Sequence, residues 1–554
     1  MKYKWLVIFL ILSWGGAFSF SVNAFEIKET YPRIANYYLQ PLVPKEHYDD
    51  LAKYDLLILD VDVQTIDSNL FSQIKKYNEE IKFLAYTPSQ TIYVKYLDSW
   101  ARFRNLMYDK VNTNDWWLKD SQGNKIGFNE TWPEIKFIDS NDQWNQFMSD
   151  LVVNDIASRD IWDGIFYDMV FANLYWLNNG DIDIDQDGQM DNSEAIDNYW
   201  YSQTNDLLQK TKARINKPLI ANLNIPDNYE ENLNGIMMEN FPAEWLGENG
   251  WSLLMNSYLK NLPDKNQLPQ IYIINSNVDN TGQMDNYREM RFGLTNTLLG
   301  DGYFSFDSGD QTHSQTWWYD EYDENLGQAE SSPHNLLDQG NKEIKPGLWR
   351  RDFENGITLV NSTDQNQVYV FDKEEFESIN GTQDRRINHG AKVNLVNLKP
   401  KDGVVLLKIN KEIRNTNFNN GSFIRVFNQQ GKQTRNGFFT YQDNFSGNTQ
   451  ILITDLNNDN KDETLVNGNG VISIHQNNGE VNSFTPYNFS GDVSFAVGDV
   501  NNDGLNEIVT GAGFGNGPHI KVFSQAGQLL NEFVAYDQEF RGGVDVAVGD
   551  VNND

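Results

Sequence analysis

Short apolar runs alternate with longer stretches of helix-like polarity along residues 25–320. A short apolar run predicts a strand that is buried on both faces, as in a parallel sheet. The eight runs are Arg33–Leu39, Leu56–Asp60, Lys82–Tyr86, Gly164–Asp168, Leu219–Asn224, Gly235–Asn240, Gln270–Asn275 and Gly302–Asp307. Eight strands joined by helical crossovers predict an α/β chain with a (β/α)₈ TIM barrel. A doubly wound open sheet is the alternative, but no glycine-rich phosphate loop follows the first run.

The pattern changes after the barrel. In residues 343–410, β-rich runs such as Gly356–Val360 and Gly403–Leu407 alternate with Asn, Gly and Asp turns. This pattern is typical of a small antiparallel β-sandwich domain, which we expect to pack on the barrel and stabilise it.

Residues 420–554 repeat at an interval of 48 residues, marked by Ile424-Arg-Val-Phe, Ile472-Ser-Ile-His and Ile520-Lys-Val-Phe. Repeats of this length made of short strands predict β-propeller blades. The sequence stops at Asp554, inside the third copy of an acidic segment. Because so few blades cannot close a ring, we expect that the propeller is truncated here.

Composition narrows the function classes. The chain has 44 Lys+Arg against 78 Asp+Glu, a net charge of −34, and no basic patch, so a nucleic-acid partner is not expected. The negative electrostatic field of such a chain also concentrates divalent cations around it. There is no cysteine, so disulfides and thiol chemistry play no part.

The first 24 residues have the pattern of a secretory signal peptide. Lys2 and Lys4 precede an apolar core, and Val22-Asn23-Ala24 forms a small-residue cleavage site. We therefore expect a secreted or cell-surface protein. An uncleaved membrane anchor is the alternative, although the apolar run is short for a full span.

An acidic loop follows the fourth apolar run and has oxygen ligands at the EF-hand spacing, with Gly188 at the sharp turn. The predicted Ca²⁺ ligands are Asp183, Asp185, Asp187, the Gln189 carbonyl, Asp191 and Glu194. Carboxylates this close repel one another unless a cation neutralises them. The alternative is a solvated acidic loop without metal.

Each repeat also has ligand-type residues at alternate positions, which predicts a compact calcium loop between two strands. The predicted ligands are Asp455, Asn457, Asp459, Lys461 and Glu463 in one repeat, and Asp499, Asn501, Asp503, Leu505 and Glu507 in the next. An Asp/Asn-rich turn without metal is the alternative.

Two sets of motifs resemble known families. The segments DGIFYDM, DIDIDQDGQMD and GLWRRDFENGITLVN resemble a family of hypothetical glycoside hydrolase-like (β/α)₈ proteins, over roughly residues 30–410. The repeats resemble FG-GAP (integrin α-type) calcium-binding propeller repeats. Together these resemblances imply an exported protein that acts on a carbohydrate, with cell-surface or matrix contacts through the repeats. The rival interpretation is a non-catalytic carbohydrate-binding or adhesion protein.

Glycoside hydrolysis needs two carboxyl groups that flank the scissile bond. Asp168 ends the fourth run and Glu239 lies at the end of the sixth. An aspartate nucleophile on the fourth strand with an acid/base on the sixth is similar to the layout of retaining α-galactosidase-like and endo-galactosaminidase barrels. Asp168 could instead be a helix cap or turn former, and Glu244 is an alternative to Glu239.

Other polar strand-end residues are predicted to hydrogen-bond sugar hydroxyls: Asp60, Asp62, Tyr86, Asn222, Asn224 and Asp307. The insertion at residues 90–150, between the third and fourth runs, is rich in tryptophan and is typical of a lid or binding wall. Because indole faces stack on sugar rings, Trp116 and Trp117 are predicted to contact the substrate. The alternative is that both tryptophans belong to a local core.

Overall fold

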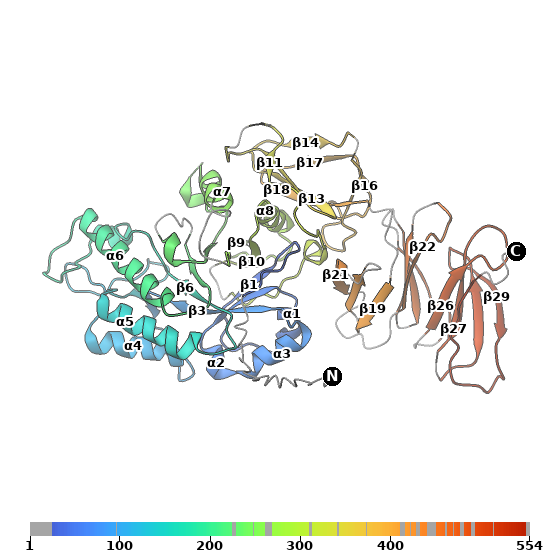
Figure 1. The fold of residues 1–554 in the computed structure, drawn as a ribbon, viewed down its shortest axis with the longest axis horizontal. Coiled ribbons are helices and arrows are strands. Elements are labelled where there is room, and N and C mark those ends of the chain that lie inside the picture. Colours follow the sequence, from blue (N-terminus) through green and yellow to red (C-terminus); the bar gives the residue numbers. More distant parts are fainter. Residues whose placement is uncertain are drawn as a thin grey trace, which may run out of the picture.

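We describe a computed structural model of the chain (Figure 1). The residues that it describes are 25–95, 97–223, 229–247, 249–260, 269–309, 313–338, 340, 343–372, 374–409, 416–420, 423–427, 433–439, 450–459, 462–468, 470–476, 481–488, 493–513 and 515–549. Within these ranges, no helix combines the length and the apolar composition that crossing a membrane requires.

The predicted barrel is present, and each of its eight strands falls on one of the predicted apolar runs. Its strands, in their spatial order, are β1 (Ala35–Tyr38), β2 (Leu56–Asp60), β3 (Lys82–Pro88), β6 (Gly164–Asp168), β7 (Leu219–Asn222), β8 (Gly235–Met238), β9 (Ile273–Asn277) and β10 (Tyr303–Asp307). Every neighbouring pair is parallel. A parallel bridge between Ile34 and Phe304 brings the first and last strands together, so the sheet is nearly closed.

Helices follow the strands and cover the outside of the barrel. The α-helices of the described residues are α1 (Tyr48–Leu51), α2 (Val63–Ile66), α3 (Asn69–Tyr77), α4 (Arg102–Asn114), α5 (Asp142–Leu151), α6 (Ser193–Lys212), α7 (Gly250–Lys260) and α8 (Tyr287–Leu298). A π-helix, Val152–Ala157, extends α5. The 3₁₀ turns are Lys45–His47, Leu177–Gly180, Glu230–Asn232, Glu244–Leu246 and Asp320–Asp323.

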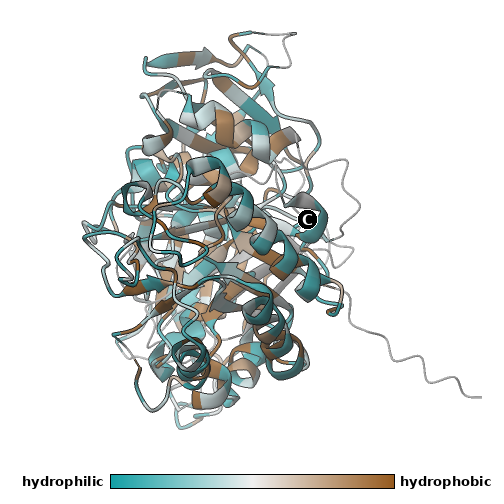
Figure 2. Ribbon diagram, turned by 90° about the vertical axis from the view of Figure 1, so that its left-hand side faces the viewer, coloured by the Kyte–Doolittle hydropathy of each residue, from teal (hydrophilic) through white to brown (hydrophobic). Residues whose placement is uncertain are grey.

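The barrel has two hydrophobic cores, one inside the sheet and one between the sheet and the helices. The interior core is small and includes Leu56, Ile58, Phe166, Ile220 and Met237, all fully buried. The outer core is larger and continues under the helices. Figure 2 shows the corresponding pattern, with hydrophobic residues on the strands and hydrophilic residues dominating the loops and outer helix turns.

The insertion at residues 90–150 packs beside the barrel as β4 (Thr91–Tyr93), α4, β5 (Ile135–Phe137) and nearly all of α5. β4 and β5 pair as an antiparallel ribbon. Asn141 begins α5 by accepting hydrogen bonds from the backbone N–H groups of Gln143 and Trp144.

Antiparallel sheets follow the barrel, as predicted. A six-stranded sheet and a two-stranded sheet enclose a core of their own. The first contains β11 (His334–Asn335), β12 (Leu348–Asp352), β13 (Gly356–Asn361), β18 (Asp402–Lys408), β15 (Phe376–Ser378) and β16 (Lys392–Val393), and the second β14 (Gln367–Val370) and β17 (Leu395–Leu398). We call this unit the β-domain. It docks on the barrel helix α8, where Arg291 pairs with Asp384 and Asp402 of the β-domain.

The repeats form antiparallel sheets that follow one another along the chain. The first sheet has three strands, β19 (Thr416–Asn420), β20 (Phe423–Phe427) and β21 (Gln433–Phe439). The second has four, β22 (Gln450–Thr454), β23 (Glu463–Gly468), β24 (Val471–His475) and β25 (Val481–Phe484). The third also has four, β26 (Val493–Gly498), β27 (Glu507–Ala512), β28 (His519–Phe523) and β29 (Leu529–Val534). The two four-stranded sheets lie side by side (Figure 1) and share one core, which includes Leu465, Ile472 and Ile508. The repeated motif falls on the third strand of each, at Ile472 and Ile520, as expected for blades.

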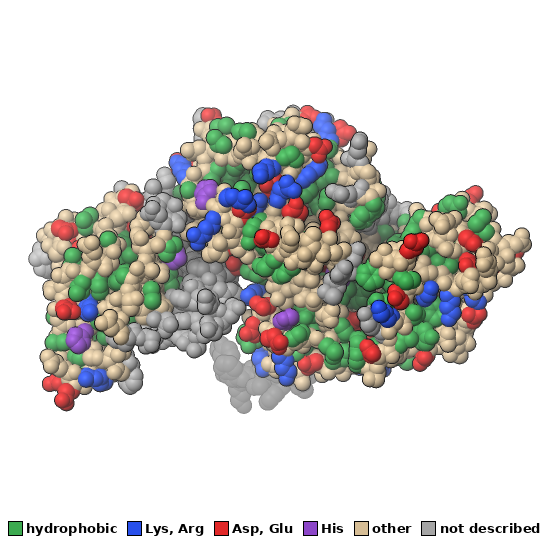
Figure 3. Space-filling model, turned by 180° about the vertical axis from the view of Figure 1, so that it is seen from behind, with side chains coloured by type: hydrophobic (Ala, Val, Ile, Leu, Met, Phe, Trp, Pro, Cys, Tyr) green, Lys and Arg blue, Asp and Glu red, His purple; other side chains and the backbone are tan. Residues whose placement is uncertain are grey.

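Acidic and basic side chains mix on the face of the molecule seen in Figure 3, where Lys and Arg lie among Asp and Glu.

Candidate functional site

Asp168 is the end of β6 and lies at the mouth of the barrel, with 7% of its surface exposed. Two side chains from neighbouring strands hold its carboxylate. The Tyr86 hydroxyl, on β3, donates a hydrogen bond of 2.7 Å to one oxygen. The Asn222 amide, on β7, donates one of 2.9 Å to the other. Asp168 is not a helix cap, since no helix begins within several residues of it. Its side chain is therefore fixed in the strand-end position where barrel chemistry usually takes place.

Asn222 joins the two predicted catalytic carboxyl groups. The same Nδ2 atom that donates to Asp168 also donates to Glu239, at 2.5 Å. The two accepting oxygens can therefore lie no farther apart than the sum of these distances, about 5.4 Å. This limit is close to the spacing of about 5–5.5 Å in retaining glycosidases and below the roughly 6.5–9.5 Å of inverting ones.

Glu239 follows β8 and has polar and charged neighbours. Its side chain is 21% exposed, and the Nε2 atom of His313 lies 4.0 Å from its Oε1 atom. Burial raises the pKa of Glu239 to about 7, with a further rise from the charges of Asp168 and Asp307; His313 and the Asn222 hydrogen bond oppose the rise. A carboxyl group with this pKa can hold a proton near neutral pH and also release it.

The sequence prediction missed His313, whose imidazole is a basic group beside Glu239. His313 follows β10, and its Nδ1 atom lies 3.0 Å from Asp307, the residue that ends that strand. Its ring packs against Tyr37 of β1 at a centroid distance of 4.6 Å. The signal available in the sequence was a histidine shortly after a strand-end aspartate, in a chain with only six histidines.

Asp60 ends β2 and Asp62 lies two residues beyond it, and their surroundings differ. Asp60 is 4% exposed and lies 3.4 Å from Arg104. Burial raises the pKa of Asp60 to about 6, although Arg104 opposes the rise. Asp60 also adds to the charge around Tyr86, so it belongs to the edge of the site.

The structure places the Asp62 carboxylate at the start of α4 and not at an open surface. It is 1% exposed, and its carboxylate accepts a hydrogen bond of 2.9 Å from the Phe103 backbone N–H in the first turn of α4. Backbone N–H groups of Arg102 and Arg104 also stabilise its charge. Asp62 is thus a capping group for α4, because a helix start leaves N–H groups that need acceptors. Asn224 and the side chain of Glu244 lie outside the described residues.

The predicted tryptophan platform is wrong. Trp117 is 1% exposed and Trp116 9%, so neither offers an open indole face to a sugar. Both belong to the outer core of the barrel, and Lys110 and Lys125 lie over their rings. The core alternative therefore describes them better, because both indoles pack into the core that the insertion shares with the barrel.

Exposed indoles do occur, on the loops that carry the catalytic candidates. Trp176, on the loop after β6, is 48% exposed, and Trp245, on the loop after β8, is 61% exposed. Phe171 packs against Trp176 at 5.3 Å, and the Trp176 indole N–H donates to the Asn173 carbonyl at 3.1 Å. The Trp176 ring is therefore held in one orientation with part of its surface free.

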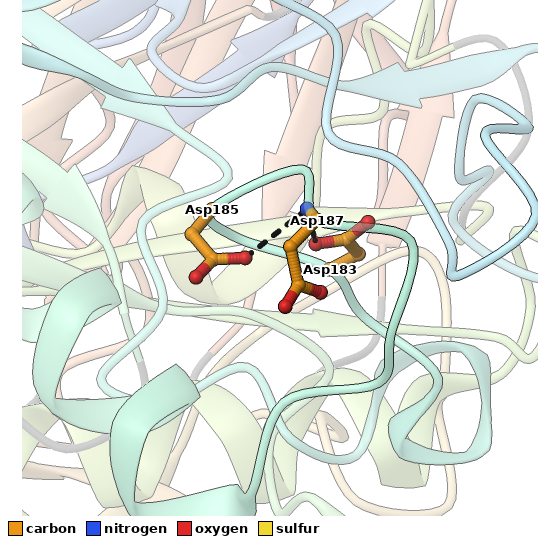
Figure 4. A group of neighbouring side chains, drawn as sticks. All are labelled: Asp183, Asp185 and Asp187. Atoms are coloured by element: carbon orange, nitrogen blue, oxygen red, sulfur yellow. Dashed lines mark hydrogen bonds between the residues drawn. The ribbon is translucent and has the colours of Figure 1, made fainter.

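The acidic loop brings three carboxylates together. Oxygen atoms of Asp183, Asp185 and Asp187 all lie within 4.8 Å of one another (Figure 4). Asp183 is buried, and it accepts hydrogen bonds from the backbone N–H groups of Asp187 and Gly188, at 3.1 and 2.8 Å. Gly188 has φ of +85°, the left-handed conformation that the predicted sharp turn requires.

The remaining predicted ligands of this loop lie around the cluster. Asp191 accepts a hydrogen bond from the Ile184 N–H at 2.8 Å, and the Gln189 side chain donates to Asp187. Glu194 is exposed in the first turn of α6 and is not part of the three-carboxylate cluster. The donor set is made of hard oxygen atoms, which fits Ca²⁺.

The two repeat loops have nearly the same hydrogen bonds as one another. Asp459 N–H donates to Asp455 and Asn457, and Asp503 N–H donates to Asp499 and Asn501. Glu463 and Glu507 accept from the backbone N–H of Leu456 and Val500, respectively, so both glutamates turn back toward their loops. Leu505 is exposed within its loop, and Lys461 lies outside the described residues. Oxygen-rich loops of this kind are also suited to Ca²⁺.

The family of the chain follows from a comparison with protein-family models. Residues 75–357 match the model described as "Hypothetical glycosyl hydrolase family 15". The match covers half of the chain. The chain belongs to hypothetical glycosyl hydrolase family 15. Its matched region contains Asp168, Asn222, Glu239 and His313, and thus most of the site described above. Residues 493–529 match the FG-GAP repeat, as the sequence predicted.

This member of hypothetical glycosyl hydrolase family 15 is also similar to solved glycosidase structures, at low sequence identity. An α-L-fucosidase isoenzyme 2 from Paenibacillus thiaminolyticus has 12% identity and a TM-score of 0.36, with 51% of this chain and 46% of that chain covered. A variant of the GH36 α-galactosidase AgaA from Geobacillus stearothermophilus has 10% identity and a TM-score of 0.35, with 69% and 56% covered.

A third solved structure is the uncharacterized protein lmo2446 from Listeria monocytogenes EGD-e, in complex with glucose, magnesium and calcium. It has 8% identity and a TM-score of 0.38, with 80% of this chain and 47% of that chain covered. The chain spans about half the length of these structures. No curated protein matches the chain by sequence.

Proposed function

We propose that the protein is an exported glycoside hydrolase that cleaves a poly- or oligosaccharide with retention of configuration, with Asp168 as nucleophile and Glu239 as general acid/base. The family supports the reaction class. The observation that carries the mechanism is the Asn222 amide, whose one nitrogen donates to both carboxyl groups. A pair this close suits direct attack by a carboxylate and leaves little room for an attacking water between the groups.

In the proposed first step, Glu239 donates its proton to the glycosidic oxygen as the bond from that oxygen to the anomeric carbon breaks. Asp168 bonds to the anomeric carbon and forms a glycosyl ester. In the second step, Glu239 takes a proton from water, the water oxygen bonds to the anomeric carbon, and the ester bond to Asp168 breaks. The hydrogen bonds from Tyr86 and Asn222 stabilise the Asp168 carboxylate when it leaves.

The substrate that we propose is a chain of several sugars. Trp176 follows Asp168 along the chain and Trp245 follows Glu239, and both rings are exposed, so they are suited to sugar units on either side of the cleaved bond. Asp60 and Asp307 remain as acceptors for sugar hydroxyls near the barrel mouth.

We propose calcium as a structural ion in the loop 183–194 and in the two repeat loops. When bound, it neutralises carboxylates that would otherwise repel one another. Asp183, Asp185 and Asp187 would hold the ion in the first loop, and Asp455 and Asp499 with their neighbours in the repeats. The repeats would serve cell-surface or matrix contacts of the exported protein.

The test is release of reducing sugar from a panel of polysaccharides, with wild type beside Asp168→Asn. The isosteric amide keeps the shape of the side chain but loses its charge, so turnover should fall by about 10⁴-fold or more while binding remains. Full activity of Asp168→Asn would remove this assignment. Binding of a polysaccharide by the wild type without any turnover would favour the rival function, a carbohydrate-binding surface protein.

A further inference from the structure

His313 contacts residues of the first and last barrel strands and also lies beside the catalytic carboxyl group of Glu239. Its Nδ1 atom lies 3.0 Å from Asp307, and its Nε2 atom lies 4.0 Å from Glu239. The ring is only 12% exposed and packs against Tyr37. His313 therefore lies between two carboxyl groups, Asp307 on one side and Glu239 on the other.

Asp307 fixes which way the imidazole faces. Its carboxylate accepts hydrogen bonds from Asn275 Nδ2 at 3.1 Å and from the Gly309 N–H at 2.8 Å, so it is held in place. Because a carboxylate can only accept, the Nδ1 atom of His313 carries the hydrogen of their 3.0 Å contact. The Nε2 atom is then the one that faces Glu239, and a proton there makes the ring a cation beside that carboxyl group.

The charges around the ring favour this cation. Burial by itself lowers the pKa of His313, but the hydrogen bond and charge of Asp307, together with Glu239 and Asp168, raise it to about 9. Within the described part of the chain, the groups that act on Glu239 are Asp168 from β6, Asn222 from β7, Asp307 from β10, His313 itself and the Tyr37 hydroxyl from β1. His313 is the only base among them.

We propose that His313 is a positioning residue for the acid/base step: held by Asp307, its imidazolium orients Glu239 and limits how tightly that carboxyl group keeps its proton. The inference deepens the proposed function, on which it rests. Glu239 must give a proton in the first step and accept one in the second. Without the His313 cation, Glu239 would lie beside the carboxyl groups of Asp168 and Asp307 alone. It would then keep its proton and act poorly as a base.

The first experiment compares pH profiles of kcat/KM for wild type and His313→Gln. Glutamine is neutral, so Glu239 loses the charge that favours its ionised form. We expect the basic limb of the profile to move up by about one pH unit. His47→Gln is the matched control, because His47 contacts Tyr38, the neighbour of Tyr37 on β1, and is not among the groups that shift the pKa of Glu239. A lower rate with the limb at its wild-type position would mean a merely structural role and would overturn the proposal.

The second experiment reads the same coupling without any substrate. NMR of the full chain labelled at histidine Cε1 and at the glutamate carboxyl carbon follows both titrations, with assignments from His313→Gln and Glu239→Gln. We expect a cationic His313 at pH 7, a lower pKa for it in Asp307→Asn, and a higher pKa for Glu239 in His313→Gln. A neutral His313 in the wild type, or an unmoved Glu239 titration, contradicts the proposal. An inactive wild type with the expected titrations would remove the glycosidase assignment and keep the coupling.

Discussion

At the scale of single residues, the site depends on side chains that come from strand ends far apart in the sequence. Asn222 is the clearest case, because one amide nitrogen contacts Asp168 and Glu239 from the strand between theirs. The sequence predicted each of these three residues from its place at the end of an apolar run. It could not predict that they share one hydrogen-bond donor, since that depends on the tilt and curvature of the closed sheet.

The pKa of Glu239 leads to a prediction for the wild type. Its value of about 7 is raised by burial, and the general acid must be protonated to act. We therefore expect kcat/KM to decrease as the pH rises through about 7. In Glu239→Gln the basic limb should disappear, and substrates with an activated aryl leaving group should lose much less rate than natural ones. A basic limb that persists in Glu239→Gln would assign it to another group.

Gly235, the first residue of β8, has no room for a side chain. A Cβ atom there would lie 1.7 Å from the carbonyl oxygen of Ile271, which leads into the adjacent strand. Because backbone cannot yield as a side chain can, Gly235→Ala should lower the free energy of unfolding by about 3 kcal/mol or more. The measurement is urea unfolding. Gly549→Ala is the control, since a Cβ there meets no atom within 4 Å; equal stability of the two variants would contradict the prediction.

At the scale of elements, strands were easier to predict than the inserted segments. The eight barrel runs are buried on both faces, so each carries an apolar signal that does not depend on its neighbours. Trp116 and Trp117 look the same in the sequence whether they line a cleft or fill a core. Which of the two they do depends on how α4 packs against the barrel. Asp62 is equally ambiguous in the sequence, because its carboxylate could bind a ligand or accept hydrogen bonds from the first turn of α4.

The acidic loop gives a prediction on metal binding. Asp185→Asn in the full chain should lower the number of bound Ca²⁺ by one, as measured by isothermal titration calorimetry. It should also reduce the calcium-dependent stabilisation, which amounts to about 2.7 kcal/mol per site at a hundredfold excess over Kd. Asp120→Asn is the control, because Asp120 is partnered by its own turn at Asn124 and lies outside the cluster. An unchanged stoichiometry in Asp185→Asn would count against the site.

The loop after β6 gives a prediction on substrate binding. Removal of an exposed stacking ring in Trp176→Ala should raise KM by about tenfold with little change in kcat. Tyr77→Ala is the control, because Tyr77 is 59% exposed but ends α3, which leads into the N-terminal end of β3, the opposite side of the barrel. Equal KM values for wild type and Trp176→Ala would exclude this ring from the substrate site.

At the scale of the whole molecule, the barrel and the β-domain share a buried ionic contact. Arg291 on α8 is 4% exposed, and it contacts Asp384 at 2.9 Å and Asp402 at 3.3 Å. Such a contact gives the interface one orientation, because displacement would leave buried charges without partners. The sequence predicted that the β-domain packs on the barrel but gave no indication of which helix it contacts.

Arg291→Met should therefore lower the free energy of unfolding by about 3–5 kcal/mol, because the buried Asp402 loses its paired guanidinium and the buried Asp384 keeps only the exposed Arg386. Thermal unfolding followed by tryptophan fluorescence measures the effect. Arg288→Met on the same helix should change stability by less than about 0.5 kcal/mol, since Arg288 is 49% exposed and pairs with its exposed neighbour Glu289. Similar losses in both variants would show that α8 itself, and not the buried contact, is responsible.

The meeting of the first and last barrel strands sets the time at which this protein can acquire its site. Tyr37 comes from β1, whereas Asp307 ends the closing strand β10 and His313 follows it. On a ribosome that adds roughly 5–20 residues per second, the nascent first strand would wait on the order of 15–50 s for its neighbour across the Ile34–Phe304 bridge. Until β10 has been synthesised, the apolar edge of β1 is open to contact with other chains. We therefore expect that a chaperone that covers β1 during synthesis increases the yield of native protein. The same chaperone should increase the refolding of the completed chain less.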